Sequence, residues 1–415
     1  MLLLRDAGPL AEREFRLLFA GRTVSFLGSS FATVALAFAV LELTGSKADL
    51  GYVLAARSVP TLVFLLVGGI WSDRLPRHRV MVVSNVVSGA SQAAIAILLF
   101  AGHAQVWELA ALAAVGGASS AFFFPASSGI VPQTVPESKL QQANAVLRLG
   151  RNGSVIVGGA LAGLVIHATS PATGIAIDAA SFGFAALLAA AMHIPTSDRM
   201  ESSNFFADLS LGWREFASRT WLWAIVLQFG VVNAVEQGAQ GVLGPAISRD
   251  HFSGALGWGL ILAAESFGLI AGGLILLRLR PQQILLVATF GVLLTLPLLL
   301  ALAGPLPFGA VLGFAFLAGI GTEVFGILWD TAMQQEIPAD RLSRVYSYDA
   351  LGSWALIPLG YALAGPLSEA LGTQTTLMAA AAFSLLATVA VLFVPEVRHL
   401  RRRGRVQSTE PSLVT

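Results

Sequence analysis

Long stretches of apolar residues, separated by short polar turns, make up most of this chain. Each stretch has about twenty residues or more, the length that an α-helix needs to cross the hydrocarbon core of a bilayer. The stretches cover 15–43, 50–71, 80–101, 106–130, 141–168, 172–194, 221–247, 254–277, 283–303, 308–332, 345–369 and 373–394. The pattern predicts an all-α integral membrane protein with twelve transmembrane helices.

Composition supports this class. The 415 residues are 55% hydrophobic and only 12% charged, whereas a soluble domain is about a quarter charged. The strands of a membrane β-barrel would alternate over about ten residues, but these stretches are continuous and twice as long. The chain has no cysteine, which excludes disulfides and cysteine-bound metals. We expect no metal and no cofactor.

The polar interval 195–220 divides the chain almost in half. Aromatic and apolar residues recur in it at helical spacing, which predicts an amphipathic segment on the membrane surface: Phe205, Phe206, Leu209, Trp213 and Phe216. We therefore expect an N-terminal six-helix bundle (1–194), a cytoplasmic linker (195–220), a C-terminal six-helix bundle (221–394) and a cytoplasmic tail (395–415).

The two halves are similar to each other in sequence. A shift of 202 residues places Lys139, Gly158 and Gly163 on Arg341, Gly360 and Gly365. Chance similarity between Gly- and Ala-rich helices is the alternative, but the match extends to polar loop residues. The pattern favours two pseudo-symmetric bundles.

Basic residues give the orientation, because Lys and Arg are enriched in cytoplasmic loops. Of the 25 Lys and Arg residues, Lys47 and Arg249 alone fall on one side, and four lie inside the apolar stretches. All the others fall on the opposite side together with both ends of the chain. We expect both termini to be cytoplasmic.

A charged hinge separates the second and third apolar stretches. It contains the pattern Gly69-x-x-x-Asp73-Arg74-x-x-Arg77, which resembles the loop 2–3 signature of the major facilitator superfamily of secondary transporters. The family usually has glycine in place of Pro76 and a basic residue in place of His78. An ordinary positively charged loop is the alternative interpretation.

Further segments resemble the bacterial branch that contains siderophore exporters and macrolide-type efflux proteins. They lie at 140–145, 178–182, 335–347 and 358–365. The resemblance implies a secondary active transporter in the bacterial inner membrane, with the major facilitator fold. It would export a small, moderately hydrophobic molecule (a drug, natural product or siderophore) in exchange for protons by alternating access.

Two features of this chain depart from the drug–proton antiporters of the superfamily. Helix 5 of those proteins commonly carries Gly-Pro-x-x-Gly-Gly, whereas this chain has no proline in 158–163. They also often carry an arginine on helix 4, and none occurs between Val106 and Pro132.

The resemblance also implies a gate on the cytoplasmic side. Asp73 would lie near the start of the eleventh predicted helix, 345–369. Unpaired N–H groups and the helix dipole favour a carboxylate there. The residues expected to form this gate are Gly69, Asp73, Arg74, Arg77 and Arg344.

Ionisable residues inside the apolar stretches are candidates for a substrate or proton cavity, because an unpaired charge at mid-bilayer costs about 3 kcal/mol or more. The candidates, with two amide neighbours of Glu236, are Arg22, Arg57, Arg148, Arg151, Asp178, Asn233, Glu236, Gln237, Glu265 and Glu323. A structural ion pair within one half, for instance between Asp178 and an arginine, is the alternative.

Other functions are less well supported by the sequence. No Gly-x-x-x-x-Gly-Lys-Ser/Thr motif occurs, so an ATP-driven pump is excluded. The histidines are scattered, so we expect no enzyme and no catalytic residues. An uptake symporter of the same fold and a non-transporting sensor remain open. The expected partners are a small molecule, protons and the lipid bilayer, with no nucleic acid, and we expect a monomer.

Overall fold

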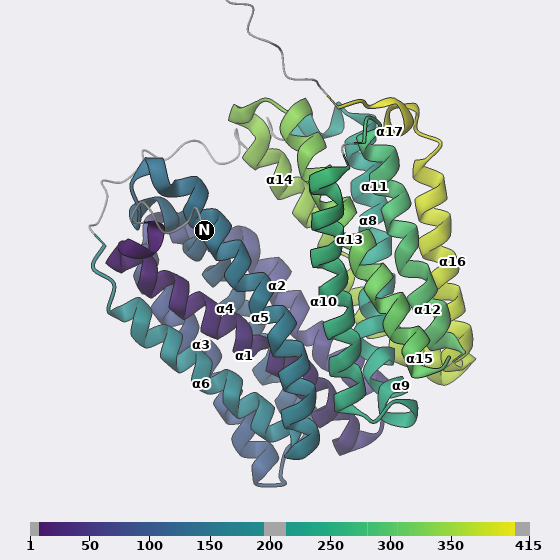
Figure 1. The fold of residues 1–415 in the computed structure, drawn as a ribbon. Coiled ribbons are helices and arrows are strands. Elements are labelled where there is room, and N and C mark those ends of the chain that lie inside the picture. Colours follow the sequence, from purple (N-terminus) through teal and green to yellow (C-terminus); the bar gives the residue numbers. More distant parts are fainter. Residues whose placement is uncertain (1–7, 195–212, 280, 305, 403–415) are drawn as a thin grey trace, which may run out of the picture.

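The structure, a computed structural model, describes residues 8–194, 213–279, 281–304 and 306–402. Throughout these ranges the regular elements are helices (Figure 1). The first half contains α1 (Arg13–Thr44), α2 (Lys47–Arg74), α3 (Arg77–Phe100), α4 (Val106–Gly129), α5 (Leu140–Ala168) and α6 (Pro171–Ala190), with short 3-10 turns at Pro9–Ala11, Val131–Gln133 and Glu137–Lys139. The second half contains α8 (Thr220–Gly238), α9 (Gly244–His251), α10 (Ala255–Arg278), α11 (Ile284–Val292), α12 (Leu296–Ala303), α13 (Phe308–Glu336), α14 (Ala339–Trp354), α15 (Ile357–Leu371), α16 (Thr373–Val391) and α17 (Pro395–His399).

Ten helices in the described residues are long and apolar enough to cross a membrane. They include α11 with α12, and α14 with α15, each pair counted as one candidate span. The two other predicted stretches correspond to α2 and to α8 with α9. Gln228, Asn233, Glu236 and Gln237 make α8 more polar than its neighbours. The all-helical class is confirmed, and the count of twelve spans stays a prediction.

Three stretches that the sequence predicted as continuous helices are irregular in the middle. A π-helical turn (Ala239–Leu243) joins α8 to α9, a 3-10 turn (Leu293–Thr295) joins α11 to α12, and a two-residue turn separates α14 from α15. A proline is the second residue after each of these three points: Pro245, Pro297 and Pro358. Proline has no N–H for the bond to the preceding turn, so the helix changes its hydrogen bonding there.

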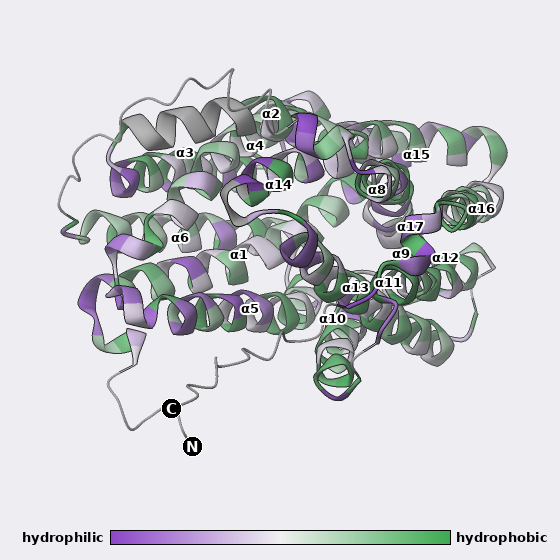
Figure 2. Ribbon diagram, turned by 90° about the horizontal axis from the view of Figure 1, so that it is seen from above, coloured by the Kyte–Doolittle hydropathy of each residue, from purple (hydrophilic) through white to green (hydrophobic). Residues whose placement is uncertain are grey.

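The helices gather in two groups. Figure 1 shows α1–α6 on the left and α8–α16 on the right, and Figure 2 shows the same separation from above. We call the side of Figure 1 where α14 and α17 lie the upper face, and the side where α9 lies the lower face. The hinge between α2 and α3 contains only Leu75 and Pro76, which is the tight hairpin that the sequence predicted.

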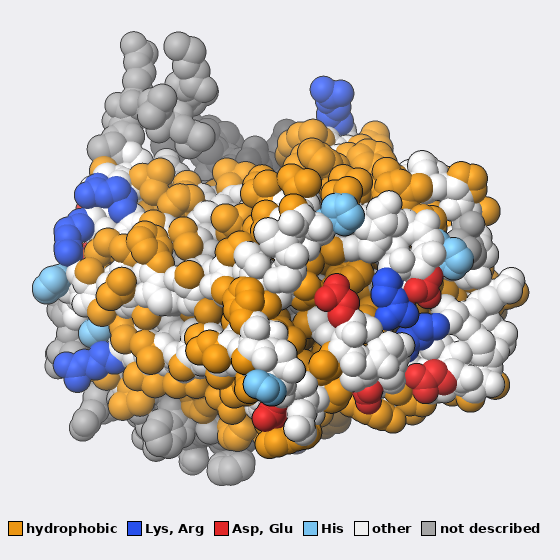
Figure 3. Space-filling model, turned by 90° about the horizontal axis from the view of Figure 1, so that it is seen from below, with side chains coloured by type: hydrophobic (Ala, Val, Ile, Leu, Met, Phe, Trp, Pro, Cys, Tyr) orange, Lys and Arg blue, Asp and Glu red, His pale blue; other side chains and the backbone are white. Residues whose placement is uncertain are grey.

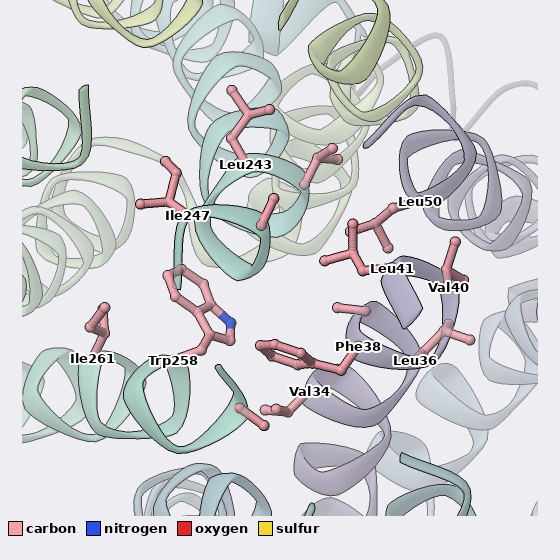
Figure 4. Close-up of a cluster of buried hydrophobic side chains, with 14 of the residues drawn as sticks. Val34, Leu36, Phe38, Val40, Leu41, Leu50, Leu243, Ile247, Trp258 and Ile261 are labelled. Atoms are coloured by element: carbon pink, nitrogen blue, oxygen red, sulfur yellow. The ribbon is translucent and has the colours of Figure 1, made fainter. Parts of the chain in front are cut away.

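One hydrophobic core joins the two groups at the lower face. Phe38 and Leu41 of α1 meet Leu243 of the π-turn, Ile247 of α9 and Trp258 of α10 in this cluster (Figure 4). Towards the upper face each group has a core of its own, formed by different residues in the first half and in the second half. The two halves therefore share a hydrophobic core at the lower face and have separate cores towards the upper face.

Glycines let the helices approach closely where the halves meet. A Cβ atom added to Gly163 of α5 would lie 2.7 Å from the Ala255 carbonyl oxygen of α10, and one added to Gly259 would lie 2.8 Å from the Gly159 carbonyl oxygen. On the other side of the molecule, a Cβ at Gly51 of α2 would collide with the backbone of α15. Only glycine fits at these crossings.

Equivalent ion pairs hold the upper end of each half. Lys139, just before α5, pairs with Glu12, just before α1, at 2.8 Å. Arg341, on the first turn of α14, pairs with Glu215, just before α8, at 2.6 Å. Lys139 and Arg341 are also matched by the 202-residue shift, so the repeat seen in the sequence extends to the contacts.

The described end of the predicted amphipathic segment packs on the protein. Residues 213–217 form a short helix. The ring centres of Trp213 and Phe216 lie 5.5 and 5.8 Å from the ring centre of Tyr348 in α14. Phe216 is buried against this ring, whereas Trp213 is half exposed, and the amphipathic segment on the membrane surface stays a prediction. Phe205, Phe206 and Leu209 lie outside the described residues.

Hydrogen bonds from Arg219 and Arg341 hold the pKa of the Glu215 carboxyl below its ordinary value. Each of these bonds favours the charged form of the carboxyl group. The contact between the linker end and α14 is therefore fully formed at neutral pH.

We predict that Gly163→Val opens the lower face. The added side chain meets the backbone of α10, and overpacking of this kind costs about 1–3 kcal/mol, enough to shift an equilibrium between conformations. An Ala246→Cys reporter, placed at a fully buried position of the lower core in a chain without native cysteine, should react severalfold faster with a membrane-impermeant maleimide. Gly153→Val on the same helix is the control, because nothing lies within 4 Å of a Cβ there. Equal labelling of the two variants would contradict the prediction.

Candidate functional site

A polar rim surrounds the lower core. Lys47 Nζ donates to Thr373 Oγ1 at 2.6 Å, Ser46 Oγ donates to a Glu369 carboxylate oxygen at 3.3 Å, and Arg249 donates to the Leu41 carbonyl oxygen at 3.0 Å. All three contacts connect the first half to the second. Figure 3 shows acidic and basic side chains gathered in one part of this face. The lower face is thus closed by an apolar core and by cross-half hydrogen bonds.

The predicted gate residues lie at the upper face. Arg77, at the start of α3, donates a hydrogen bond to the Gly129 carbonyl oxygen at the end of α4. Arg344 lies near the start of α14 and is partly buried. The side chains of residues 65–74 lie outside the described part of the structure, and with them Gly69, Asp73 and Arg74, so the gate stays a prediction.

Asp178 of α6 is fully buried inside the first half. Its Oδ2 accepts a hydrogen bond from Gln92 Nε2 of α3 at 2.6 Å, and its Oδ1 accepts weaker ones from Ser29 at 3.3 Å and Ser181 at 3.4 Å. The charge of Arg57 on α2 acts on the carboxylate without direct contact. Arg57 and Gln92 line a small pocket together with residues of α4. Asp178 is therefore the centre of a polar network that joins α1, α3 and α6.

Glu236 of α8 holds a similar place in the second half. Its Oε1 accepts hydrogen bonds from Thr295 Oγ1 at 2.5 Å and from Ser384 Oγ of α16 at 3.3 Å. Glu265 of α10 is close enough to interact electrostatically with Glu236, and among the described residues its carboxylate has no hydrogen bond or ion pair. The structure thus brings together two carboxylates that the sequence predicted separately.

The two amide neighbours of Glu236 bind other helices. Asn233 Nδ2 donates to the Ser353 carbonyl oxygen at 3.0 Å, and Gln237 Oε1 accepts from the Tyr361 hydroxyl at 3.0 Å. Tyr361 lies within electrostatic reach of Arg57 in the first half. Asn233 is structural in this conformation, while Gln237 lies near the boundary between the halves.

The charged residues of α5 are exposed, and one of them acts on the second half. Arg148 and Arg151 are both exposed, and the charge of Arg148 acts on Glu323 of α13. Polar residues that are exposed on a membrane helix face water rather than lipid. Asn144 and Asn152 extend the same polar stripe of α5.

Arg22 of α1 lies next to Arg151. Its Nη1 donates to the Ser127 carbonyl oxygen of α4 at 3.2 Å, while its Nε is buried without a hydrogen-bond partner. Both guanidinium groups lie over the ring of Phe26, with Cζ atoms 5.7 and 6.0 Å from the ring centre. The two cations and the aromatic ring form one cluster.

Sequence reasoning missed a second acidic pair, Asp330 of α13 and Asp349 of α14. Tyr346 Oη donates to Asp330 Oδ1 at 3.0 Å, and Trp329 Nε1 donates to Asp349 Oδ2 at 3.1 Å. Asp330 follows Glu323 by seven residues, on the same face of the helix, and this spacing is the signal that could have found it. The described residues contain no group of three or more acidic or histidine side chains that could hold a metal ion.

We predict that Asp178→Ala destabilises the protein by about 1–3 kcal/mol, because it leaves the buried Gln92 amide without its acceptor. Thermal unfolding of the purified protein in detergent should begin at a lower temperature. Asp250→Ala, which removes an exposed carboxylate that pairs with Arg249, should change it little. Equal shifts for the two variants would show that the network around Asp178 is not structural.

Comparisons with known proteins agree with this architecture. The family model of the Major Facilitator Superfamily matches residues 18–354. The chain is 28% identical over 410 residues to the multidrug efflux pump Tap of Mycolicibacterium fortuitum, with 95% of this chain and 97% of that protein covered. It is 25% identical over 402 residues to macrolide efflux protein A of Streptococcus pyogenes, with 93% and 97% covered.

Solved structures show the same fold. The nucleoside transporter NupG matches with a TM-score of 0.71 and 16% identity, over 91% of this chain and 98% of that one. A bacterial homologue of the iron transporter ferroportin, in an inward-facing state, matches with a TM-score of 0.70 and 16% identity, over 92% and 98%. The chain therefore belongs to the Major Facilitator Superfamily and is a multi-pass membrane transporter of that type.

Proposed function

We propose that this protein exports small, moderately hydrophobic molecules from a bacterial cell in exchange for protons. Its similarity to Tap and to macrolide efflux protein A over nearly the whole chain supports export, and macrolides are the first substrates to test. The protein would act as a monomer in the inner membrane and would not be an enzyme.

One observation carries the mechanism: the halves share a core at the lower face and have separate cores at the upper face. This arrangement fits one state of an alternating-access cycle, in which a central site opens to a single side. The excess of basic residues on the upper side supports its assignment as cytoplasmic. The structure then corresponds to an inward-facing state, ready to take substrate from the cytoplasm.

The membrane topology is part of the proposal. With α2, and with α8 and α9 as one continuous span, the helices make two bundles of six spans each, over residues 1–194 and 221–394. The equivalent ion pairs Glu12–Lys139 and Glu215–Arg341 support a repeat of this kind. Residues 195–220 would form the cytoplasmic linker, and residues 395–415 the cytoplasmic tail.

The gate and the proton site complete the proposal. The hinge residues Asp73 and Arg74 would contact the start of α14 when the upper face closes, and break this contact when it opens. Protons would bind at Glu236 and Glu265. These two carboxylates interact electrostatically, and interacting acids bind their protons as a coupled pair. A proton that neutralises one of them removes the repulsion and weakens the link from α8 to Thr295 and Ser384.

Export is tested in an efflux-deficient bacterial host that expresses the protein. We expect lower accumulation of macrolides and of other hydrophobic drugs than in cells without the protein, and we expect a protonophore to abolish the difference. Higher accumulation in the expressing cells would instead show uptake. An unchanged level across the whole panel would contradict transport of this class.

We predict that Glu236→Gln abolishes coupling to the proton gradient and leaves the fold intact. The glutamine side-chain oxygen can still accept from Thr295 and Ser384, but it cannot bind and release a proton at physiological pH. In proteoliposomes, pH-driven drug movement should fall to the level of liposomes without the protein, with an unchanged melting temperature. Glu137→Gln, in an exposed turn, is the control. Full pH-driven transport by the Glu236 variant would dismiss the assignment.

A further inference from the structure

We propose that Arg22 and Arg151 form a subsite that binds the acidic group of the transported molecule, next to Phe26. The substrates that use this subsite are then aromatic acids, with a carboxylate or a comparable oxyanion beside a flat apolar ring. This inference rests on the proposed transport function and names a substrate class for it.

The first argument is geometric. Arg22 and Arg151 come from different helices. Their guanidinium carbons lie 5.7 and 6.0 Å from the centre of the Phe26 ring. The two cations are near enough to repel each other electrostatically. Two cations that repel each other are both stabilised when an anion binds near them.

The second argument is that the described residues supply no counter-ion. Among the described residues, neither Arg22 nor Arg151 makes an ion pair, and Arg22 Nε is buried with no hydrogen-bond partner. The other two embedded arginines differ, because the charge of Arg148 acts on Glu323 and that of Arg57 acts on Asp178. A cation that is partly buried in a membrane helix is costly without a partner, so Arg22 would be stabilised by a bound anion.

The third argument is chemical. A guanidinium group donates two parallel hydrogen bonds to a carboxylate, and this fork gives strength and orientation together. The partly buried Phe26 ring beside it offers an apolar surface on which another ring can pack. Arg151 is exposed, so a ligand from the water-filled side reaches it first and the less accessible Arg22 second.

Two matched pairs of probes test the subsite: rhodamine B with its ethyl ester, and salicylate with methyl salicylate. The first compound of each pair has a free carboxylate, and in the second this group is an ester. The purified protein is placed in phosphatidylcholine nanodiscs, so that no anionic lipid headgroup competes. Rhodamine binding is followed by fluorescence polarisation, and salicylate binding by the shift in melting temperature.

We expect the wild-type protein to bind the acid about tenfold more tightly than the ester, as two charge-assisted hydrogen bonds allow. Arg151→Gln should remove this preference by weakening the acid and leaving the ester unchanged. Arg22→Gln should do the same, and Arg22→Lys, which keeps the charge, should retain part of it. Arg214→Gln, at an exposed surface arginine, should keep the full preference.

Failure of the subsite is distinct from failure of the proposed function. If neither pair shows a preference for the acid, or if both arginine variants weaken acid and ester equally, the subsite is wrong. The same holds if anionic phosphatidylglycerol in the nanodisc abolishes the preference, because the cluster then binds a lipid headgroup. Macrolide export in cells is measured independently of all these outcomes, and its absence would count against the transport proposal alone.

Discussion

Backbone contact across the lower face is the constraint on which the rest of this structure depends. The crossings of α5 with α10 and of α2 with α15 bring main-chain atoms together where a side chain would not fit. In a bilayer the lipid tails are as apolar as leucine, so helices associate mainly through close packing. Glycine-lined crossings are strong contacts of this kind. They hold the halves together below and leave the upper ends free to separate.

The distribution of charge follows from this arrangement. The arginines embedded in the first half lie on α1, α2 and α5, and the embedded glutamates of the second half lie on α8, α10 and α13. One pair of opposite charges acts between the halves, since the charge of Arg148 reaches Glu323. Such residues avoid the cost of facing lipid because they face water, a neighbouring helix or a ligand.

The helices and their approximate limits could be predicted from the sequence, since each needs only a long apolar stretch between polar turns. The breaks near Pro245, Pro297 and Pro358 were not predicted, although the prolines were visible, because Pro60, Pro125 and Pro366 lie inside helices without such a break. Whether a proline interrupts a helix depends on the neighbouring helices, which can satisfy the freed carbonyl groups. Local sequence does not contain this information.

The candidate site was predicted in its residue types and not in its pairings. Charge inside an apolar stretch identified Asp178, Glu236 and Glu265, because such residues are costly wherever the helices pack. The sequence could not show that Gln92 binds Asp178, that Ser384 binds Glu236, or that Arg22 and Arg151 share one aromatic ring. These contacts join helices that are far apart in the chain.

The sequence by itself determined the membrane class, the helical fold and the family resemblance, because hydrophobic length, charge bias and a local motif are properties of short segments. The tertiary structure alone decided which face is closed, which carboxylates meet and which arginines have no counter-ion among the described residues. Those outcomes depend on the distances between helices, and these distances are set by packing across the whole molecule.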